Sequence, residues 1–130
     1  MSGDPQVLDP AALERLRGWG GPPLVGRMIE LFRELGPQRL REVEEGLAAE
    51  DLSRVARAAH SFKSSAGNLG ADRLRLLCAA LEAAAEDGRR EDSVRLAADL
   101  PGAYGATIAE VEALQAEAGG THPDDKESVG

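Results

Sequence analysis

The apolar residues between Leu52 and Leu69 recur at alternating steps of three and four. This spacing places them on one face of an α-helix, so it predicts an amphipathic helix over these residues. Similar apolar stripes occupy residues 24–47, 74–85 and 94–114. Runs of β-branched residues with period two do not occur in the sequence, so a β-sheet is not supported. The sequence therefore predicts an all-α protein.

Capping and turn residues separate the stripes into helices with short connections. Asp51 is expected to cap the helix that begins at Leu52, and Gly70 is expected to end it. Gly88 should end the following helix, and Asp92 should cap the last one. Long amphipathic helices with short connections predict an up-down-up-down antiparallel four-helix bundle.

A short extra N-terminal helix is expected to pack over one end of the bundle. Asp9 followed by Pro10 is typical of a helix start, and three glycines within residues 18–21 are expected to end this helix. Two breaks lie inside the later stripes, at Gly36-Pro37 and Pro101-Gly102. Because the stripe resumes almost in phase after Gly36-Pro37, this site is predicted to be a kink and not a chain reversal. The last helix is expected to be kinked near Pro101-Gly102.

The length of 130 residues fits one domain. Hydrophobic residues make up 42% of the chain but aromatic residues only 3%, so Leu, Val and Ala must build most of the core. The bundle domain is expected over residues 9–118, after a flexible N-terminus at residues 1–8. Residues 119–130 have no apolar stripe and are predicted to form a disordered tail, which contains His122.

The charge balance and the cysteine content exclude several classes of function. A formal net charge of -8 disfavours binding to nucleic acid or to anionic membranes, which need a basic surface. No stretch approaches the ~20 apolar residues that span a bilayer, and no signal peptide is evident. Cys78 has no partner for an internal disulfide and is expected to be buried. These features predict a cytoplasmic protein.

His60 is predicted to lie on the outer face of the helix over residues 52–69. With ~100° between successive residues, it stands roughly 130° from the centre of the apolar stripe. The surrounding face is small or basic, whereas other exposed helix faces carry Arg and Glu. We expect this face to form a docking surface for a partner. Its expected partner-binding residues are Ala56, Arg57, Ser64, Gly67 and Ala71.

Lys63 follows His60 by one helical turn. The chain contains thirteen Arg but only two Lys, so a lysine at this position is unusual. An exposed neutral imidazole is a nucleophile, and a flexible ammonium group beside it can stabilise the charge of a phosphoryl group. His60 is therefore a candidate phosphoacceptor and Lys63 a candidate phosphoryl-stabilising residue. A solitary surface histidine is the alternative that these residues leave open.

The run Ala-His-Ser-Phe-Lys-Ser-Ser-Ala-Gly-Asn-Leu-Gly-Ala at residues 59–71 resembles the signature of histidine-containing phosphotransfer (HPt) domains. That signature is usually written Ala-His-x-Leu-Lys-Gly-x-x-x-x-Leu-Gly. The likeness extends over residues 24–104, including Leu81-Glu82. It departs from the signature at Ser64, where many members have glycine, and this difference bears on the rate of transfer.

The resemblance implies a role for each matching residue. His60 would accept a phosphoryl group through its Nε2 atom, and Lys63 would assist. The partners would be receiver domains of response regulators and a hybrid histidine kinase in a multistep phosphorelay. The receiver would supply the aspartate and the Mg²⁺, so this chain would need no metal or other cofactor. The protein would be a phosphocarrier without kinase activity of its own.

Two other functions are alternatives to phosphotransfer. A helical interaction module that binds a receiver without being phosphorylated would not need His60 and Lys63 together. An enzyme that uses His60 as a base or metal ligand would need converging partners, which the sequence lacks. Three glutamates are expected to lie on solvated helix faces: Glu82, Glu110 and Glu112. A bundle complete in one chain is expected to be a monomer.

Overall fold

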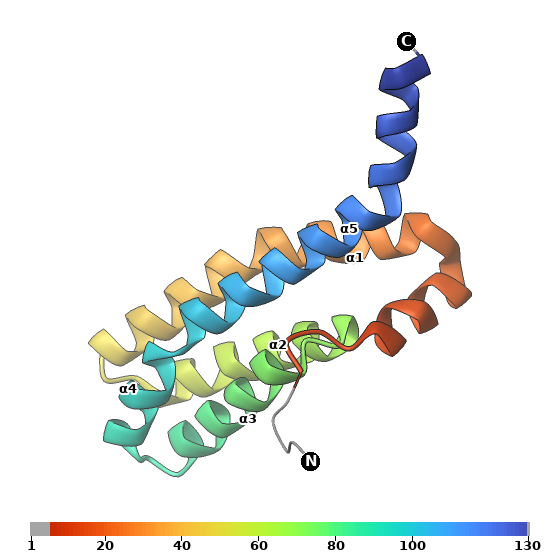
Figure 1. Ribbon diagram of the computed structural model, residues 1–130. Helices are drawn as coiled ribbons and strands as arrows, with labels where there is room; N and C mark the ends of the chain where they lie inside the picture. Colours follow the sequence, from red (N-terminus) through yellow and green to blue (C-terminus); the bar gives the residue numbers. More distant parts are fainter. Residues whose placement is uncertain (1–5, 130) are drawn as a thin grey trace, which may run out of the picture.

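The computed structural model describes the backbone of residues 6–129 and the side chains of residues 6–116. It has five helices, and the backbone over residues 6–129 contains no strand. The helices are α1 (Pro10–Ala48), α2 (Leu52–Leu69), α3 (Asp72–Glu86), α4 (Arg90–Ala98) and α5 (Leu100–Val129) (Figure 1).

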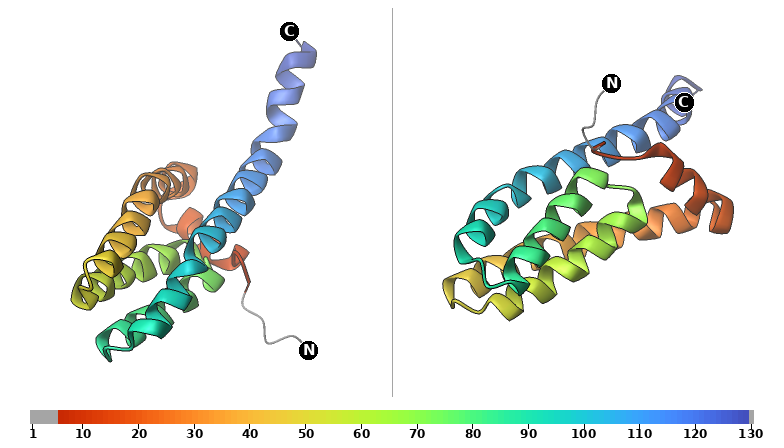
Figure 2. Two further views of the ribbon diagram at one scale, coloured as in Figure 1. Left: turned by 90° about the vertical axis from the view of Figure 1, so that its left-hand side faces the viewer. Right: turned by 90° about the horizontal axis from the view of Figure 1, so that it is seen from below.

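The helices form the predicted antiparallel four-helix bundle. The long second part of α1 lies beside α5 and packs against α2, and α3 packs against α2, α4 and α5 (Figures 1 and 2). Short connections, residues 49–51 and 70–71, join α1 to α2 and α2 to α3, and these neighbours run antiparallel. The fourth position of the bundle is filled by α4 and α5 together. The all-α prediction and the bundle architecture are confirmed.

The short extra N-terminal helix forms the first part of α1. Gly21 has φ 73° and ψ −174°, values that interrupt the helix and turn the chain back toward the bundle. The side chain of Asp9 accepts a hydrogen bond from the backbone N–H of Ala11 at 3.0 Å, as expected of an N-cap. The backbone N–H of Asp9 donates to the carbonyl of Gly70 at 2.7 Å. This helix therefore packs over the turn between α2 and α3.

The structure describes the segments at the two ends of the predicted domain only in part. Leu8 is buried, and the carbonyl of Gln6 accepts a hydrogen bond from the backbone N–H of Arg73 at 2.8 Å. Residues 1–5, the rest of the N-terminus expected to be flexible, lie outside the described residues. The predicted disordered tail, residues 119–130, falls where no side chain is described. The division at residue 118 stays a prediction.

The ends of α2 follow the sequence signals. Asp51 accepts a hydrogen bond from the backbone N–H of Arg54 at 3.1 Å and so caps the N-terminus. Gly70 ends the helix in the left-handed region, with φ 75°. A Cβ atom added at Gly70 would lie 2.5 Å from the Cβ of Ala12, so the N-terminal helix leaves no room there.

Replacing Gly70 by alanine is expected to destabilise the protein more than the same change at Gly88. Both glycines have positive φ, 75° and 74°, so both substitutions meet the left-handed penalty of about 1–2 kcal/mol. Only Gly70 also faces Ala12, whereas a Cβ at Gly88 meets nothing within 4 Å. Urea unfolding should therefore give Gly70→Ala a free energy of unfolding about 1–2 kcal/mol below that of Gly88→Ala. Equal losses would mean that the N-terminal helix does not pack on this turn.

The start of α4 and the break between α4 and α5 differ from the prediction. The helix begins at Arg90 without a side-chain cap, so the prediction that Asp92 caps it was wrong. Asp92 lies within the first turn, where hydrogen bonds from Arg95 and Arg89 hold the pKa of its carboxyl below its ordinary value. The break expected near Pro101 falls at Asp99, between α4 and α5.

The core side of α4 was also predicted incorrectly. Val94 is 43% exposed, whereas the neighbouring Ser93 is fully buried and its hydroxyl donates to the carbonyl of Arg89 at 2.8 Å. A serine that bonds its own helix backbone can occupy a core position at little cost. Ser93 therefore takes the core position in the first turn of α4 that the apolar pattern assigns to Val94, while Leu100 of the same pattern is buried as predicted.

Three aromatic rings join the long part of α1 to α2 and α5. The ring centroids of Phe32 and Tyr104 are 5.2 Å apart, and those of Phe62 and Tyr104 are 5.8 Å apart. The Tyr104 hydroxyl donates to the carbonyl of Phe32 at 3.1 Å. The ring packs directly on Gly36, where a side chain would collide with it, and α1 continues through Gly36-Pro37 without reversing. The apolar stripe on α2 lies in this core, as predicted, and its fully buried members are Val55, Ala59, Phe62, Ala66 and Leu69.

Cys78 is fully buried on α3, as the sequence predicts. Burial raises the pKa of its thiol to about 12, so the thiol stays protonated at neutral pH. Its position in the core and its protonation state both agree with a structural role.

Candidate functional site

His60 projects from the exposed face of α2. Its side chain is 61% exposed, whereas the adjacent Ala59 is fully buried in the core. The helical period explains the difference, because consecutive residues are separated by ~100° around the axis. The sequence-based placement of the imidazole on the surface is confirmed.

Glu82 of α3 connects the two residues that the sequence singled out. Its Oε2 lies 2.9 Å from Nδ1 of His60, and its Oε1 accepts a hydrogen bond from Nζ of Lys63 at 2.7 Å. Each carboxylate oxygen therefore has its own partner on α2. The imidazole and the ammonium are held side by side by a single residue of the neighbouring helix.

The interpretation of Glu82 as a solvated residue was wrong. Its side chain is only 14% exposed, less than that of Lys63 at 31%. The hydrogen bond from Lys63 is the main cause of a pKa below the ordinary glutamate value, and the contact with His60 lowers the pKa further. Glu82 is therefore a carboxylate at neutral pH. Glu110 and Glu112 are exposed, and Glu112 pairs with Arg33 at 3.2 Å.

The turn at Gly70 brings Glu82 of α3 next to His60 of α2. It joins α2 and α3 as antiparallel neighbours, so residues before and after the turn come opposite each other. On α3, Cys78 and Leu81 point into the core, and Glu82 directly follows a core position at the edge facing α2. In the sequence, Glu82 is visible only as an acidic residue beside the apolar stripe of α3. Its contact with His60 depends on the rotation of α3 against α2, which the stripe alone does not determine.

The predicted docking surface is only partly present. Arg57 and Ser64 are exposed, and Gly67 is half-buried beside Arg75. Ala71, by contrast, is fully buried before the first turn of α3, so assigning it to the partner surface was wrong. Helix α2 ends at Leu69, and extending its outer face to residue 71 was therefore unjustified.

Ala56 lies at the base of a shallow cavity beside His60. The cavity measures about 460 Å³ and is bounded by both α2 and α3. Ala56 itself is only 8% exposed, so it leaves room in the surface and offers little contact area. The residues that line the cavity are Ala56, Arg57, His60, Ser61, Glu82 and Glu86.

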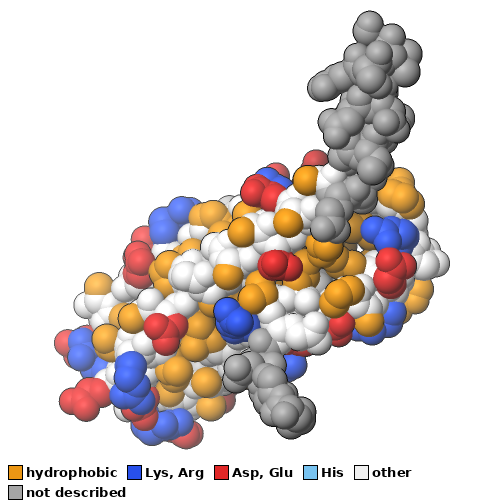
Figure 3. Space-filling model, viewed as in Figure 1, with side chains coloured by type: hydrophobic (Ala, Val, Ile, Leu, Met, Phe, Trp, Pro, Cys, Tyr) orange, Lys and Arg blue, Asp and Glu red, His pale blue; other side chains and the backbone are white. Residues whose placement is uncertain are grey.

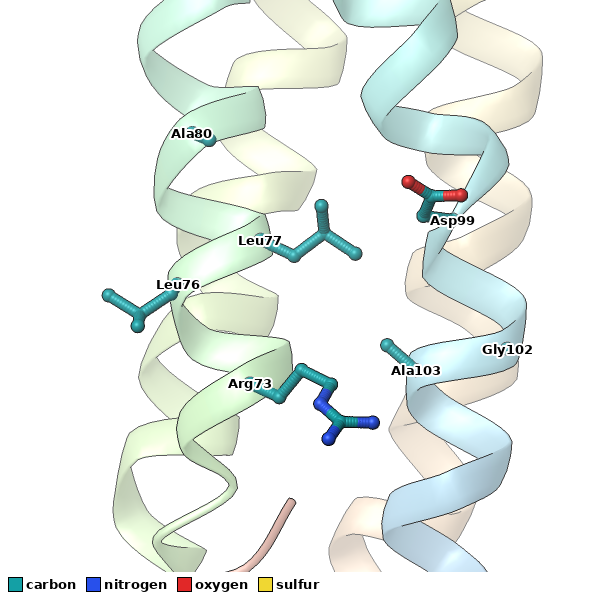
Figure 4. Close-up of a pocket in the computed structure, with 7 residues that line it drawn as sticks. All are labelled: Arg73, Leu76, Leu77, Ala80, Asp99, Gly102 and Ala103. Atoms are coloured by element: carbon teal, nitrogen blue, oxygen red, sulfur yellow. The ribbon is translucent and has the colours of Figure 1, made fainter. Parts of the chain in front are cut away.

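A second hollow lies between α3 and α5, away from His60. It measures about 570 Å³ and is lined by Arg73, Leu76, Leu77, Ala80, Asp99, Gly102 and Ala103. Leu77 and Ala103 point into the space between the helices, while Leu76 points outward (Figure 4). Its only ionisable lining residues are Arg73 and Asp99, and no histidine lines it.

Several other charged side chains of the domain form ion pairs on its surface. Side chains of both signs gather at the end of the bundle where α3 meets α4 (Figure 3), and there Arg89 and Arg95 both pair with Asp92. Exposed pairs of this kind contribute little to stability. Among the residues whose placement is described, no group of three or more His, Cys, Asp or Glu side chains could hold a metal ion. Within the same residues, no helix is long and apolar enough to cross a membrane.

Comparisons with known proteins agree with the resemblance noted in the sequence. Residues 27–117 match the Hpt domain family. No curated protein matches the chain in sequence. Among solved structures, histidine-containing phosphotransfer protein B (HptB) from Pseudomonas aeruginosa PAO1 is similar, with a TM-score of 0.81 and 23% identity. The match covers 88% of this chain and 98% of HptB.

The histidine-containing phosphotransfer protein ZmHP2 from maize is similar with a TM-score of 0.75 and 21% identity, over 85% of each chain. At these identities the structural likeness concerns the fold. The family match is independent of it and includes the whole of α2 and α3, and therefore His60, Lys63 and Glu82. The chain belongs to the Hpt domain family, the histidine phosphotransfer domains of phosphorelays.

Proposed function

We propose that His60 is the residue that carries the phosphoryl group, and that it does so on Nε2. The observation that carries the proposal is the contact between Nδ1 and the Glu82 carboxylate at 2.9 Å. A carboxylate only accepts hydrogen bonds, so Nδ1 of the neutral ring carries the proton. The lone pair of the neutral ring is then on Nε2, on an exposed side chain that a partner can approach.

Lys63 supplies the positive charge that a phosphoryl group needs. It lies one turn after His60, and its Nζ is held at 2.7 Å from Oε1 of Glu82. A lysine ammonium has three rotatable donors, so it can bind the carboxylate and a phosphoryl oxygen together. Phosphoryl transfer depends mainly on such positioning and charge stabilisation. Lys63 is thus proposed as the phosphoryl-stabilising residue.

Hpt domains are phosphotransfer carriers and interact with receiver domains and histidine kinases. For this chain we propose the same role without kinase activity of its own, with a receiver aspartate as donor and acceptor and a hybrid histidine kinase upstream. The receiver would contribute the Mg²⁺. The protein is expected to act as a monomer in the cytoplasm. Arg57, Ser64 and Gly67 are proposed to contact the partner around His60.

The direct test is to incubate the protein with phosphorylated receiver domains and follow the label. The expected result is one phosphate on the protein that is stable in base and lost in acid, located on His60 by peptide mass spectrometry. Phosphate on a hydroxyl residue, or no transfer from any receiver and none from phosphoramidate, would rule out the proposal.

Gly67→Arg is expected to block the receiver without impairing His60. Residue 67 lies two turns from His60 on the same face of α2, so a long side chain there would obstruct a docked domain. Phosphoramidate is small enough to reach the ring in any case. We therefore expect near wild-type labelling by phosphoramidate and at least a tenfold slower reaction with a phospho-receiver, equivalent to about 1.4 kcal/mol.

The matched control for Gly67→Arg is Gly105→Arg. Gly105 is an exposed helical glycine on α5 with nothing within 4 Å of an added Cβ, so it accepts the same change away from the site. Both rates should remain normal in this variant. If Gly67→Arg reacted normally with both donors, the partner would not dock over residue 67. If it lost both reactions equally, Gly67 would instead shape the histidine.

A further inference from the structure

Glu82 faces Nδ1 of His60, the ring nitrogen that stays free when Nε2 carries a phosphoryl group. When Nε2 carries a phosphoryl group, Nδ1 is the only ring nitrogen that can gain or lose a proton. A phosphorylated imidazole without this proton is neutral and releases the phosphoryl group slowly. With the proton it is a cation and a much better leaving group. The residue that faces Nδ1 therefore affects how reactive the carrier is.

We propose that Glu82 retains the proton on Nδ1 of phosphorylated His60, so that the phosphoryl group is carried on a cationic ring that readily donates it. This inference rests on the proposed phosphorylation of His60. In the present geometry Oε2 of Glu82 stands 2.9 Å from Nδ1. If Nδ1 lost its proton, its lone pair would face a carboxylate oxygen at hydrogen-bonding distance, which is repulsive. With the proton present, the contact is a hydrogen bond between two charged groups.

The transfer step balances without any movement of a proton at the histidine. The lone pair of Nε2 attacks phosphorus, the bond from phosphorus to the receiver aspartate breaks, and that aspartate leaves as a carboxylate. The ring becomes an imidazolium whose proton remains on Nδ1, where it is hydrogen-bonded to the carboxylate of Glu82. In the reverse direction a carboxylate attacks phosphorus, the N–P bond breaks, and its electron pair returns to Nε2. The same proton stays on Nδ1 throughout.

The other charges around the ring come from α2 and α3. Arg57 and Lys63 are cations and oppose a positive ring, whereas Glu82 and Glu86 favour it. Lys63 is bonded to the other oxygen of Glu82, and this bond keeps Glu82 ionised. Of the two carboxylates, Glu82 alone has a hydrogen-bonding contact with the imidazole among the described side chains. The direct contact is therefore expected to dominate.

Glu82→Gln separates the charge of this residue from its shape. A glutamine amide can accept a hydrogen bond from Nδ1–H or donate one to the bare nitrogen, so it no longer favours the cation. Wild type and variant would both be labelled with phosphoramidate, and the lifetime of phosphohistidine would be measured between pH 6 and pH 10. At pH 8 we expect the variant to retain phosphate about tenfold longer, the size expected for loss of a bond between charged groups.

The ¹⁵N resonance of Nδ1 gives an independent readout. In phosphorylated wild type it should remain in the protonated range at pH 8, and in Glu82→Gln it should move to the unprotonated range. Transfer from the labelled variant to a receiver should slow in proportion. Glu86→Gln removes one charge from the same cavity without a bond to the ring, and we expect a smaller change in lifetime there.

The outcomes distinguish this inference from the proposed function. If neither protein accepted phosphate at His60, phosphotransfer itself would be excluded. If both accepted it and their lifetimes and Nδ1 resonances were the same at every pH, the role of Glu82 would be refuted while phosphotransfer would stand. Equal changes in Glu82→Gln and Glu86→Gln would assign the effect to the general field of the site, and would also refute the hydrogen-bonded role.

Discussion

His60→Gln is expected to abolish phosphate acceptance completely while leaving the fold unchanged. The side chain is 61% exposed, so replacing it should change the free energy of unfolding by no more than about 0.5 kcal/mol. Glutamine has no nucleophilic nitrogen comparable to Nε2, so neither a phospho-receiver nor phosphoramidate should label the variant. Mass spectrometry would report the phosphate, and circular dichroism would report helicity and melting.

The second histidine of the chain supplies the matched control. His122 receives the same substitution outside the described side chains, and His122→Gln should accept phosphate at the wild-type rate. Residual labelling of His60→Gln that disappears in the double variant would move the phosphoacceptor to His122. A large loss of helicity in His60→Gln would instead show that this imidazole supports the bundle.

Leu69→Ala is expected to have the largest effect on stability. Leu69 is 1% exposed at the C-terminal end of α2, and truncating a buried leucine costs about 2–5 kcal/mol. A loss of this size in a domain of 130 residues should lower the melting temperature by on the order of 10 °C. Urea unfolding followed by circular dichroism would measure the free energy directly.

Leu76→Ala removes the same atoms from a surface position. Leu76 is 44% exposed on α3, so the change should cost less than about 1 kcal/mol. The difference between the two variants isolates burial from the loss of a leucine in a helix. Equal destabilisation by both would show that the core side of α2 has been assigned to the wrong face.

The helices were predictable because their signals are local. The stripe on α2, the cap at Asp51 and the left-handed turn at Gly70 all lie within one segment of chain, and all three are confirmed. The prediction failed at α4, where Ser93 replaced Val94 as the buried residue. A hydroxyl satisfied by its own helix cannot be distinguished by hydrophobic pattern from a solvated one.

The part of the candidate site that lies on α2 was predictable from the sequence. The helical period alone placed His60 on the surface with Lys63 one turn away. Ala71 was misassigned because the helix was extended past its end at Leu69. Glu82 was missed because its contact depends on how two helices face each other, which is a tertiary property that no single stripe contains.

The complete site lies in one helical hairpin, which has a consequence for how the protein folds. His60 and Glu82 are separated by 22 positions, whereas Arg33 and Gln115, which bring α1 and α5 together, are separated by 82. Closing the shorter loop costs less chain entropy, and contacts between near neighbours form fastest. The α2–α3 hairpin is therefore expected to assemble before α5 docks. In pulse-labelling hydrogen exchange its amides should gain protection first, and the pairing of His60 with Glu82 should already be present in a domain whose last helix is still unfolded.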